Sequence, residues 1–167
     1  MGRTRILRNL GLLRCSSPSF EDGDFLPRRH SLDGGSISPA LSWSDVRPET
    51  ASIVLTFEDL RGLHGKPFTL WMLFNIPPGV RSLREDLSKV PLPSDVPGAA
   101  QGLNDEGTVG YAGPAPPPGG PAHRYLFQIH SLDAVLDLPP GVKRTLFDRA
   151  VNGHVLETGA LMVMFQR

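Results

Sequence analysis

Four segments of the chain have the character of long β-strands, and they constrain the fold more than any other feature. Each is rich in β-branched, aromatic and leucine residues and is bounded by Gly, Pro or Asp: residues 51–59, 67–77, 123–133 and 154–166. Residues 40–43 are a shorter candidate strand. Helical spacing is confined to residues 141–153 and to one or two turns at 81–87. We therefore predict an all-β fold, a β-sandwich with one or two short peripheral helices.

The totals predict one domain without a stabilising disulfide. The chain has 167 residues, and Lys+Arg and Asp+Glu each total 17, so its net charge gives no reason to expect a nucleic acid partner. Cys15 is the only cysteine, which excludes an internal disulfide and fits a cytoplasmic location. No apolar run approaches the roughly 18 residues of a membrane helix, so we expect no stable membrane insertion.

The N-terminus differs in composition from the rest of the chain. Residues 1–14 contain four arginines and no acid, and we predict a flexible tail there, followed by one domain at 15–167. Ile6, Leu10 and Leu13 could share one helix face, which leaves a small surface anchor as the alternative.

Common catalytic sequence motifs are missing from the chain. It has no Gly-x-Ser-x-Gly turn, no phosphate-binding glycine loop, no dinucleotide fingerprint and no His-Glu-x-x-His. The five histidines lack metal-ligand spacing, so we expect no metal and no cofactor. A hydrolase based on His123 and Asp59 has no identifiable nucleophile. We therefore expect a protein that is not an enzyme.

Strand parity predicts one polar cluster. His123 and Tyr125 are two residues apart on a predicted strand, so they project from the same face, which Phe127 and Ile129 continue into the core. Asp59 ends the apolar series of another strand, and an acid beside an imidazole fixes its orientation. The three polar residues are expected to meet at one end of the sandwich. The alternative is that each one caps a strand or satisfies a turn.

A stiff loop leads directly into this cluster. Residues 113–121 contain five prolines and three glycines. Long loops in compact domains usually have a function, and we interpret this one as a preorganised wall of a pocket. A linker and a ligand for a polyproline-binding domain are the alternatives.

Several longer stretches resemble one protein family. Residues 16–43, 74–83, 102–125 and 152–161 are similar to the bacterial, Raf-kinase-inhibitor-like members of the phosphatidylethanolamine-binding protein family, the YbhB/YbcL-type group. The central stretch, "GYAGPAPPPGGPAHRY", matches the family signature that begins at Gly110. The resemblance implies a β-sandwich with a small anion pocket at one end. It also implies phosphorylated headgroups as ligands, inhibitor-like regulation of a kinase or protease partner, and a homodimer.

The resemblance carries over to particular positions. The positions that match the family pocket or its signature loop are Asp59, Leu70, His123, Tyr125, Gly110, Pro114 and Pro116. Together they predict a non-enzymatic module that binds a small anion or a phosphorylated headgroup. The alternative is a scaffold or inhibitor that acts through its surface and has a degenerate pocket.

Two departures from the family pattern support that alternative. Leu70 stands where the family has a pocket histidine, and a charge-assisted bond of about 1.5–3 kcal/mol is lost with it, equivalent to about tenfold or more in affinity. The family's Asp-Pro-Asp-Ala-Pro reads "DLRGL", which keeps only Asp59. We hypothesise that Arg61 or His64 takes over part of the lost role. The alternative is that both are solvated.

Overall fold

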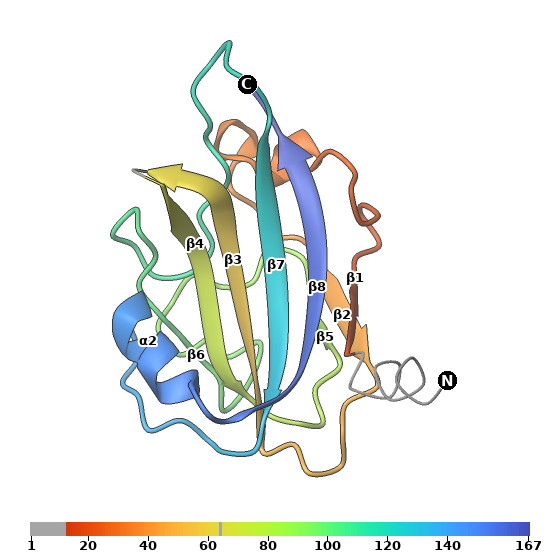
Figure 1. Cartoon of the computed structure of the whole chain (residues 1–167), viewed down its shortest axis with the longest axis vertical. Coiled ribbons are helices and arrows are strands. Elements are labelled where there is room, and N and C mark those ends of the chain that lie inside the picture. Colours follow the sequence, from red (N-terminus) through yellow and green to blue (C-terminus); the bar gives the residue numbers. More distant parts are fainter. Residues whose placement is uncertain (1–12, 64) are drawn as a thin grey trace.

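The computed structural model describes residues 13–63 and 65–167. Within them, two antiparallel sheets face each other as a sandwich (Figure 1). The larger sheet has the strand order β6 (Ala100–Gln101), β4 (Lys66–Ile76), β3 (Ser52–Leu63), β7 (His123–Leu132) and β8 (Val155–Phe165). The smaller sheet has the order β1 (Arg14–Ser16), β2 (Leu41–Ser44) and β5 (Ser82–Leu83). The predicted β-sandwich is confirmed.

The long strands form where the sequence patterns place them. β3, β4, β7 and β8 contain almost all of the four predicted segments, and the candidate at 40–43 becomes β2. The predicted turns of helix at 81–87 are wrong. That stretch contains β5, which pairs with β2 through Leu41 and Leu83. Both leucines are buried between the sheets, so tertiary packing decides the local structure there.

Alternation along β7 divides the molecule into two faces. Phe127 and Ile129 are fully buried, as parity predicts, and Phe127 stacks on Phe57 of β3 with ring centroids 3.9 Å apart. Burial of each such side chain stabilises the fold by about 1.5–3 kcal/mol. The opposite face of β7 is more exposed and includes His130. The stacked aromatic rings form the core directly beneath the end of the sandwich where β7 begins.

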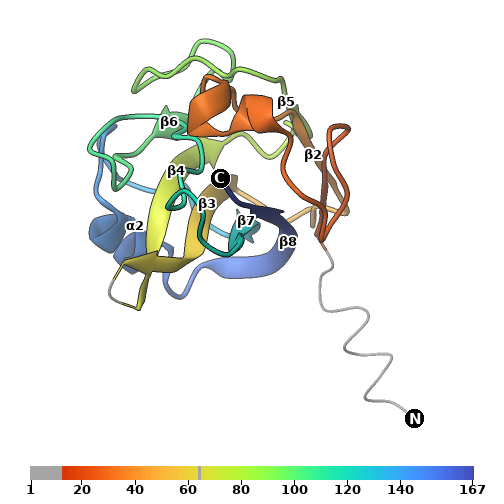
Figure 2. The ribbon, with the colours of Figure 1, turned by 90° about the horizontal axis from the view of Figure 1, so that it is seen from above.

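One helix covers the outer face of the larger sheet. α2 (Arg144–Val151) lies within the predicted 141–153 segment and buries Phe147 and Val151 against that face. Figure 2 shows α2 and the short strands β2 and β5 on opposite sides of the five-stranded sheet. Arg144 also binds Glu58 of β3, with Nη1 and Oε2 3.1 Å apart. The helix therefore supports the strand that carries Asp59 without covering the end of the sandwich.

Two residues of the predicted tail, Leu13 and Arg14, fall within the described part of the chain. Leu13 is buried, and Arg14 begins β1, which pairs with β2 at the edge of the smaller sheet. The remainder of the predicted tail, including Ile6 and Leu10, lies outside the described residues. Among the residues that are described, no helix is long and apolar enough to cross a membrane.

Candidate functional site

A cavity of about 220 Å³ opens at the end of the sandwich where β3 finishes and β7 starts. It is lined by Asp59, Gly62, Phe68, Leu70, Glu106, Ala115, Pro116, Pro117, His123 and Tyr125. Asp59 and Tyr125 are direct partners across β3 and β7, and His123 lies two residues before Tyr125 on the same face. The polar cluster expected from strand parity is therefore present.

His123 and Asp59 form a nearly enclosed pair. The Nδ1 atom of His123 lies 2.7 Å from Oδ2 of Asp59, and the side chains are only 10% and 13% exposed. Because a carboxylate oxygen only accepts, the imidazole donates from Nδ1. Within the described residues, Nε2 of His123 forms no hydrogen bond. This nitrogen is therefore available to a molecule in the cavity.

The carboxylate of Asp59 is held from its other side by a tight turn. Its Oδ1 accepts hydrogen bonds from the backbone N–H groups of Arg61 and Gly62, at 3.0 and 3.3 Å. Gly62 has φ of +54°, and a Cβ there would meet the carbonyl oxygen of Lys66 at 1.6 Å, so only glycine fits. The turn fixes the position of Asp59, and Asp59 in turn orients the ring of His123.

The hydroxyl of Tyr125 is the second free polar group. It is buried and makes no hydrogen bond of normal geometry within the described part of the chain, although the Asp59 carboxylate is nearby. Burial, with the nearby Asp59 carboxylate as a smaller cause, raises the pKa of this phenol well above its ordinary value. The hydroxyl therefore stays protonated at physiological pH. A buried O–H without a partner costs about 1–3 kcal/mol, which a bound acceptor would recover.

The remaining walls are mostly apolar. Leu70 of β4 is 3% exposed and lines the cavity beside Phe68. Pro116 is buried and forms part of the wall together with Pro117. The backbone N–H of Ala112 donates to the carbonyl of Leu70 at 2.9 Å, which ties the start of this loop to β4. The proline-rich segment is thus an anchored wall, as the sequence predicts.

Glu106 is a lining residue that sequence reasoning missed. It lies in a loop shaped by the buried side chain of Asn104, whose Oδ1 accepts from the N–H groups of Glu106 and Thr108. Asn104 also donates from Nδ2 to the Gly110 carbonyl at 2.9 Å. These contacts form across the folded loop, so residue spacing alone gave no signal for them. Glu106 adds a second carboxylate to the cavity.

Three expected site residues do not line the cavity. The Pro114 carbonyl accepts from the N–H of Leu32, and Gly110 (φ +96°) packs against Lys89, so both act in shaping the loops. The exposed side chain of Arg61 is also outside the lining, and its contribution is the backbone bond to Asp59. His64, the other residue proposed to compensate for Leu70, lies outside the described residues.

Comparison with known proteins identifies the family of the chain. The family model described as phosphatidylethanolamine-binding protein matches residues 16–166. The chain belongs to the phosphatidylethanolamine-binding protein family. It is 42% identical over 156 residues to a UPF0098 protein of Methanothermobacter thermautotrophicus, covering 93% of this chain and 99% of the relative. It is 34% identical to the UPF0098 protein YbhB of Escherichia coli over 161 residues, covering 92% and 99%.

A solved structure agrees with this assignment. The crystal structure of Escherichia coli YbcL, described as a new member of the mammalian PEBP family, matches with a TM-score of 0.86 and 27% identity. The match covers 93% of this chain and 98% of YbcL. The chain is therefore of the YbhB/YbcL type. In this member of the phosphatidylethanolamine-binding protein family, Leu70 lies in the wall of the cavity that contains His123 and Tyr125.

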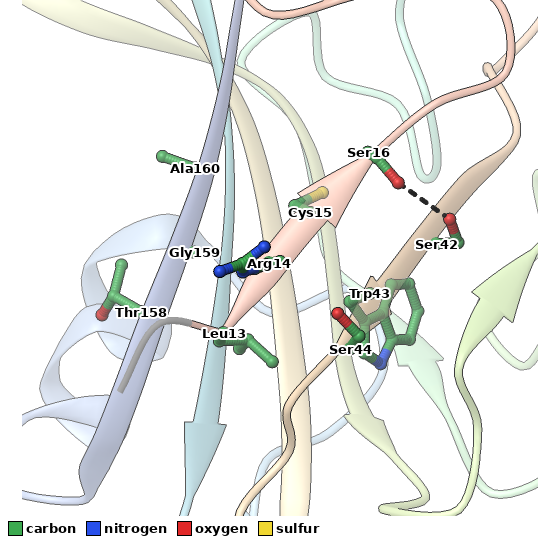
Figure 3. Close-up of a pocket in the computed structure, with 10 residues that line it drawn as sticks. All are labelled: Leu13, Arg14, Cys15, Ser16, Ser42, Trp43, Ser44, Thr158, Gly159 and Ala160. Atoms are coloured by element: carbon green, nitrogen blue, oxygen red, sulfur yellow. Dashed lines mark hydrogen bonds between the residues drawn. The ribbon is translucent and has the colours of Figure 1, made fainter. Parts of the chain in front are cut away.

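A larger recess lies on the side of the sandwich, between β1, β2 and β8 (Figure 3). Cys15 and Trp43 line it, and its volume is about 630 Å³. Burial raises the pKa of the Cys15 thiol to about 12, so the sulfur is a neutral thiol and a poor nucleophile at physiological pH. In the described residues, no group of three or more His, Cys, Asp or Glu side chains is arranged to hold a metal ion.

Proposed function

We propose that this protein is a non-enzymatic binding module whose end cavity takes a small anion or a phosphorylated headgroup. The observation that carries the proposal is the buried Tyr125 hydroxyl without a partner, beside an imidazole held by Asp59. Tyr125 donates to a ligand oxygen through its O–H. His123 offers Nε2, which donates when the ring carries both protons.

The size of the cavity suits a small headgroup and not a large substrate. Its volume of about 220 Å³ is below the usual range for drug-sized ligands. Phe68, Leu70 and the two wall prolines give apolar contact around the polar pair. Among the lining residues described, no serine, threonine, cysteine or lysine is present, so the common hydroxyl, thiol and amine nucleophiles are missing from this cavity.

Leu70 and Glu106 favour a second candidate function. An apolar wall and an additional carboxylate both disfavour an anion, the first by desolvation and the second by repulsion. In this candidate the cavity is degenerate and the protein acts through its surface as an inhibitor-like regulator of a partner protein. The two candidates differ in whether a free headgroup binds at all.

Calorimetric titration separates them. Inorganic phosphate and phosphoethanolamine are titrated into the protein and into the variant Tyr125→Phe. The matched control is Tyr111→Phe, which removes the other tyrosine hydroxyl; that hydroxyl donates to the His30 carbonyl, and Tyr111 does not line the cavity. Headgroup binding predicts saturable heat that Tyr125→Phe weakens about tenfold and Tyr111→Phe leaves unchanged. Absence of binding at millimolar concentration supports the surface-acting candidate instead.

A further inference from the structure

A further recess, distinct from the one between β1, β2 and β8, lies next to the end cavity that contains His123 and Tyr125, which we call the headgroup cavity. The volume of this recess is about 580 Å³, and Glu106 lines both the recess and the headgroup cavity. Leu32, Val109 and Ala112 give this recess an apolar wall, and Leu32 is 54% exposed. Ser36 and Thr108 add hydroxyl groups. Such a mixture of apolar and polar lining is typical of sites for small organic molecules.

The recess contains one charge of each sign. Its charged lining residues are Lys89 and Glu106. Within the described part of the chain, neither side chain forms an ion pair, with the other or with a third residue. A ligand with a single charge would be attracted by one of these groups and repelled by the other. A ligand that carries both charges can pair with both groups.

Lys89 is carried on an anchored backbone. The buried side chain of Gln101 donates from Nε2 to the carbonyls of Ser88 and Val90, at 2.7 and 2.8 Å, on either side of Lys89. The stem of Lys89 packs on Gly110, where a Cβ would meet it at about 3.0 Å. Lys89 therefore projects its ammonium group from a fixed base.

Glu106 is equally well anchored. The Asn104 side chain accepts from its backbone N–H at 3.1 Å, and the neighbouring Asp105 exchanges hydrogen bonds with Thr69 of β4. The backbone at both charged residues is thus fixed before any ligand arrives, whereas the two side chains are exposed and adjust to the ligand. Preorganisation of this kind lowers the entropy lost on binding.

We propose that this recess binds a zwitterion with an aliphatic side chain, that is, a free α-amino acid or a short peptide. Lys89 pairs with the ligand carboxylate and Glu106 with its ammonium group. Leu32 and Val109 contact the aliphatic side chain, and Ser36 can donate its hydroxyl hydrogen to the carboxylate. This site adjoins the proposed headgroup cavity and shares only Glu106 with it, so the proposal stands whether or not that cavity binds phosphate.

Ligands that differ in one charge test the proposal. L-leucine and L-leucyl-L-leucine are titrated by calorimetry, alongside N-acetyl-leucine, which lacks the ammonium group, and leucinamide, which lacks the carboxylate. At least one zwitterion should bind, and blocking either end should weaken it about tenfold. The relative affinities of leucine and dileucine show whether the recess prefers an amino acid or a peptide. Absence of binding by both at millimolar concentration would overturn the proposal.

Two variants locate the binding. Lys89→Met should weaken the binding of leucine or dileucine about tenfold, and leucine should then bind no more tightly than leucinamide. Glu106→Gln should likewise remove the higher affinity of leucine relative to N-acetyl-leucine. Lys66→Met and Glu21→Gln are matched controls, because both residues are exposed and lie outside the recess. Zwitterion binding that Lys89→Met and Glu106→Gln leave intact in folded protein would contradict the assignment.

Discussion

His123 donates from Nδ1 to Oδ2 of Asp59 over 2.7 Å, in a setting where the two side chains are only 10% and 13% exposed. The same pair of residue types meets at the same distance at the surface, where His154 contacts Asp133 and the side chains are 45% and 50% exposed. The two pairs therefore differ mainly in burial. An exposed pair contributes little to stability, whereas a buried acceptor that also holds two backbone N–H groups is costly to remove.

Asp59→Ala should therefore destabilise the protein by about 2–3 kcal/mol, because His123 and the N–H groups of Arg61 and Gly62 lose their acceptor. The control Asp133→Ala should cost less than about 1 kcal/mol. Urea denaturation of the two variants measures the difference. Equal losses in the two variants would contradict the structural role assigned to Asp59.

Leu70→His should increase phosphate affinity about tenfold, because it adds one charge-assisted donor to the cavity wall. Leu70→Met keeps the wall apolar at similar volume and serves as the control. Calorimetry on both variants, with thermal unfolding to confirm the fold, measures the effect. A folded Leu70→His variant with unchanged affinity would show that phosphate does not enter this cavity.

Gly62→Ala should cost at least about 2 kcal/mol, because its Cβ would overlap the Lys66 carbonyl in a left-handed turn. Gly65 also has a positive φ, +74°, but a Cβ there meets nothing within 4 Å, so Gly65→Ala should cost about 1 kcal/mol. The pair of variants separates steric overlap from backbone strain. The free energy of unfolding in urea is the measurement, and a smaller loss for Gly62→Ala would refute the account of this turn.

The fold should lose stability in alkali. Burial raises the pKa of Cys15 from 9.0 to about 12 and raises the pKa values of Tyr111 and Tyr125 above their ordinary 10.0. The unfolded chain releases these protons first, so the stabilisation is complete below about pH 9 and is lost as pH rises toward the folded-state values. Urea midpoints measured from pH 8 upward test this window.

Absorbance of tyrosinate gives an independent check. At a pH near 10 the folded protein should show less tyrosinate than the urea-unfolded chain, because burial raises the pKa values of Tyr111 and Tyr125, its only tyrosines. Cys15→Ala should abolish the earliest part of the stability loss. Native tyrosines that titrate near 10 would contradict the burial assigned to both phenols.

The sequence allowed prediction of those parts of the site that depend on strand periodicity. Alternation on two strands was sufficient to bring Asp59, His123 and Tyr125 together, because side chains two apart share a face. It did not reveal Glu106, which enters the cavity through contacts of the Asn104 side chain across a loop. The spacing at 81–87 wrongly predicted a helix, because Leu83 pairs with Leu41 of β2 and forms the short strand β5.

The family signature had a similar limit. It placed Pro116 correctly in the wall, but Pro114 and Gly110 shape the loops behind the wall instead of lining it. Arg61 was expected in the site because it replaces an acid of the family pattern. It contacts Asp59 through its backbone N–H and not through its side chain. Which atoms of a loop residue face a cavity depends on turn geometry that the signature does not encode.

Nuclear magnetic resonance of the histidine rings tests the central claim most directly. Phosphate is titrated into ¹⁵N-labelled protein while the imidazole signals of His123 and His154 are followed. The account predicts a saturable change at the Nε2 signal of His123, with the His154 signals unaffected because that pair lies at the surface outside the cavity. Saturable phosphate binding that leaves the His123 signals unchanged would contradict it.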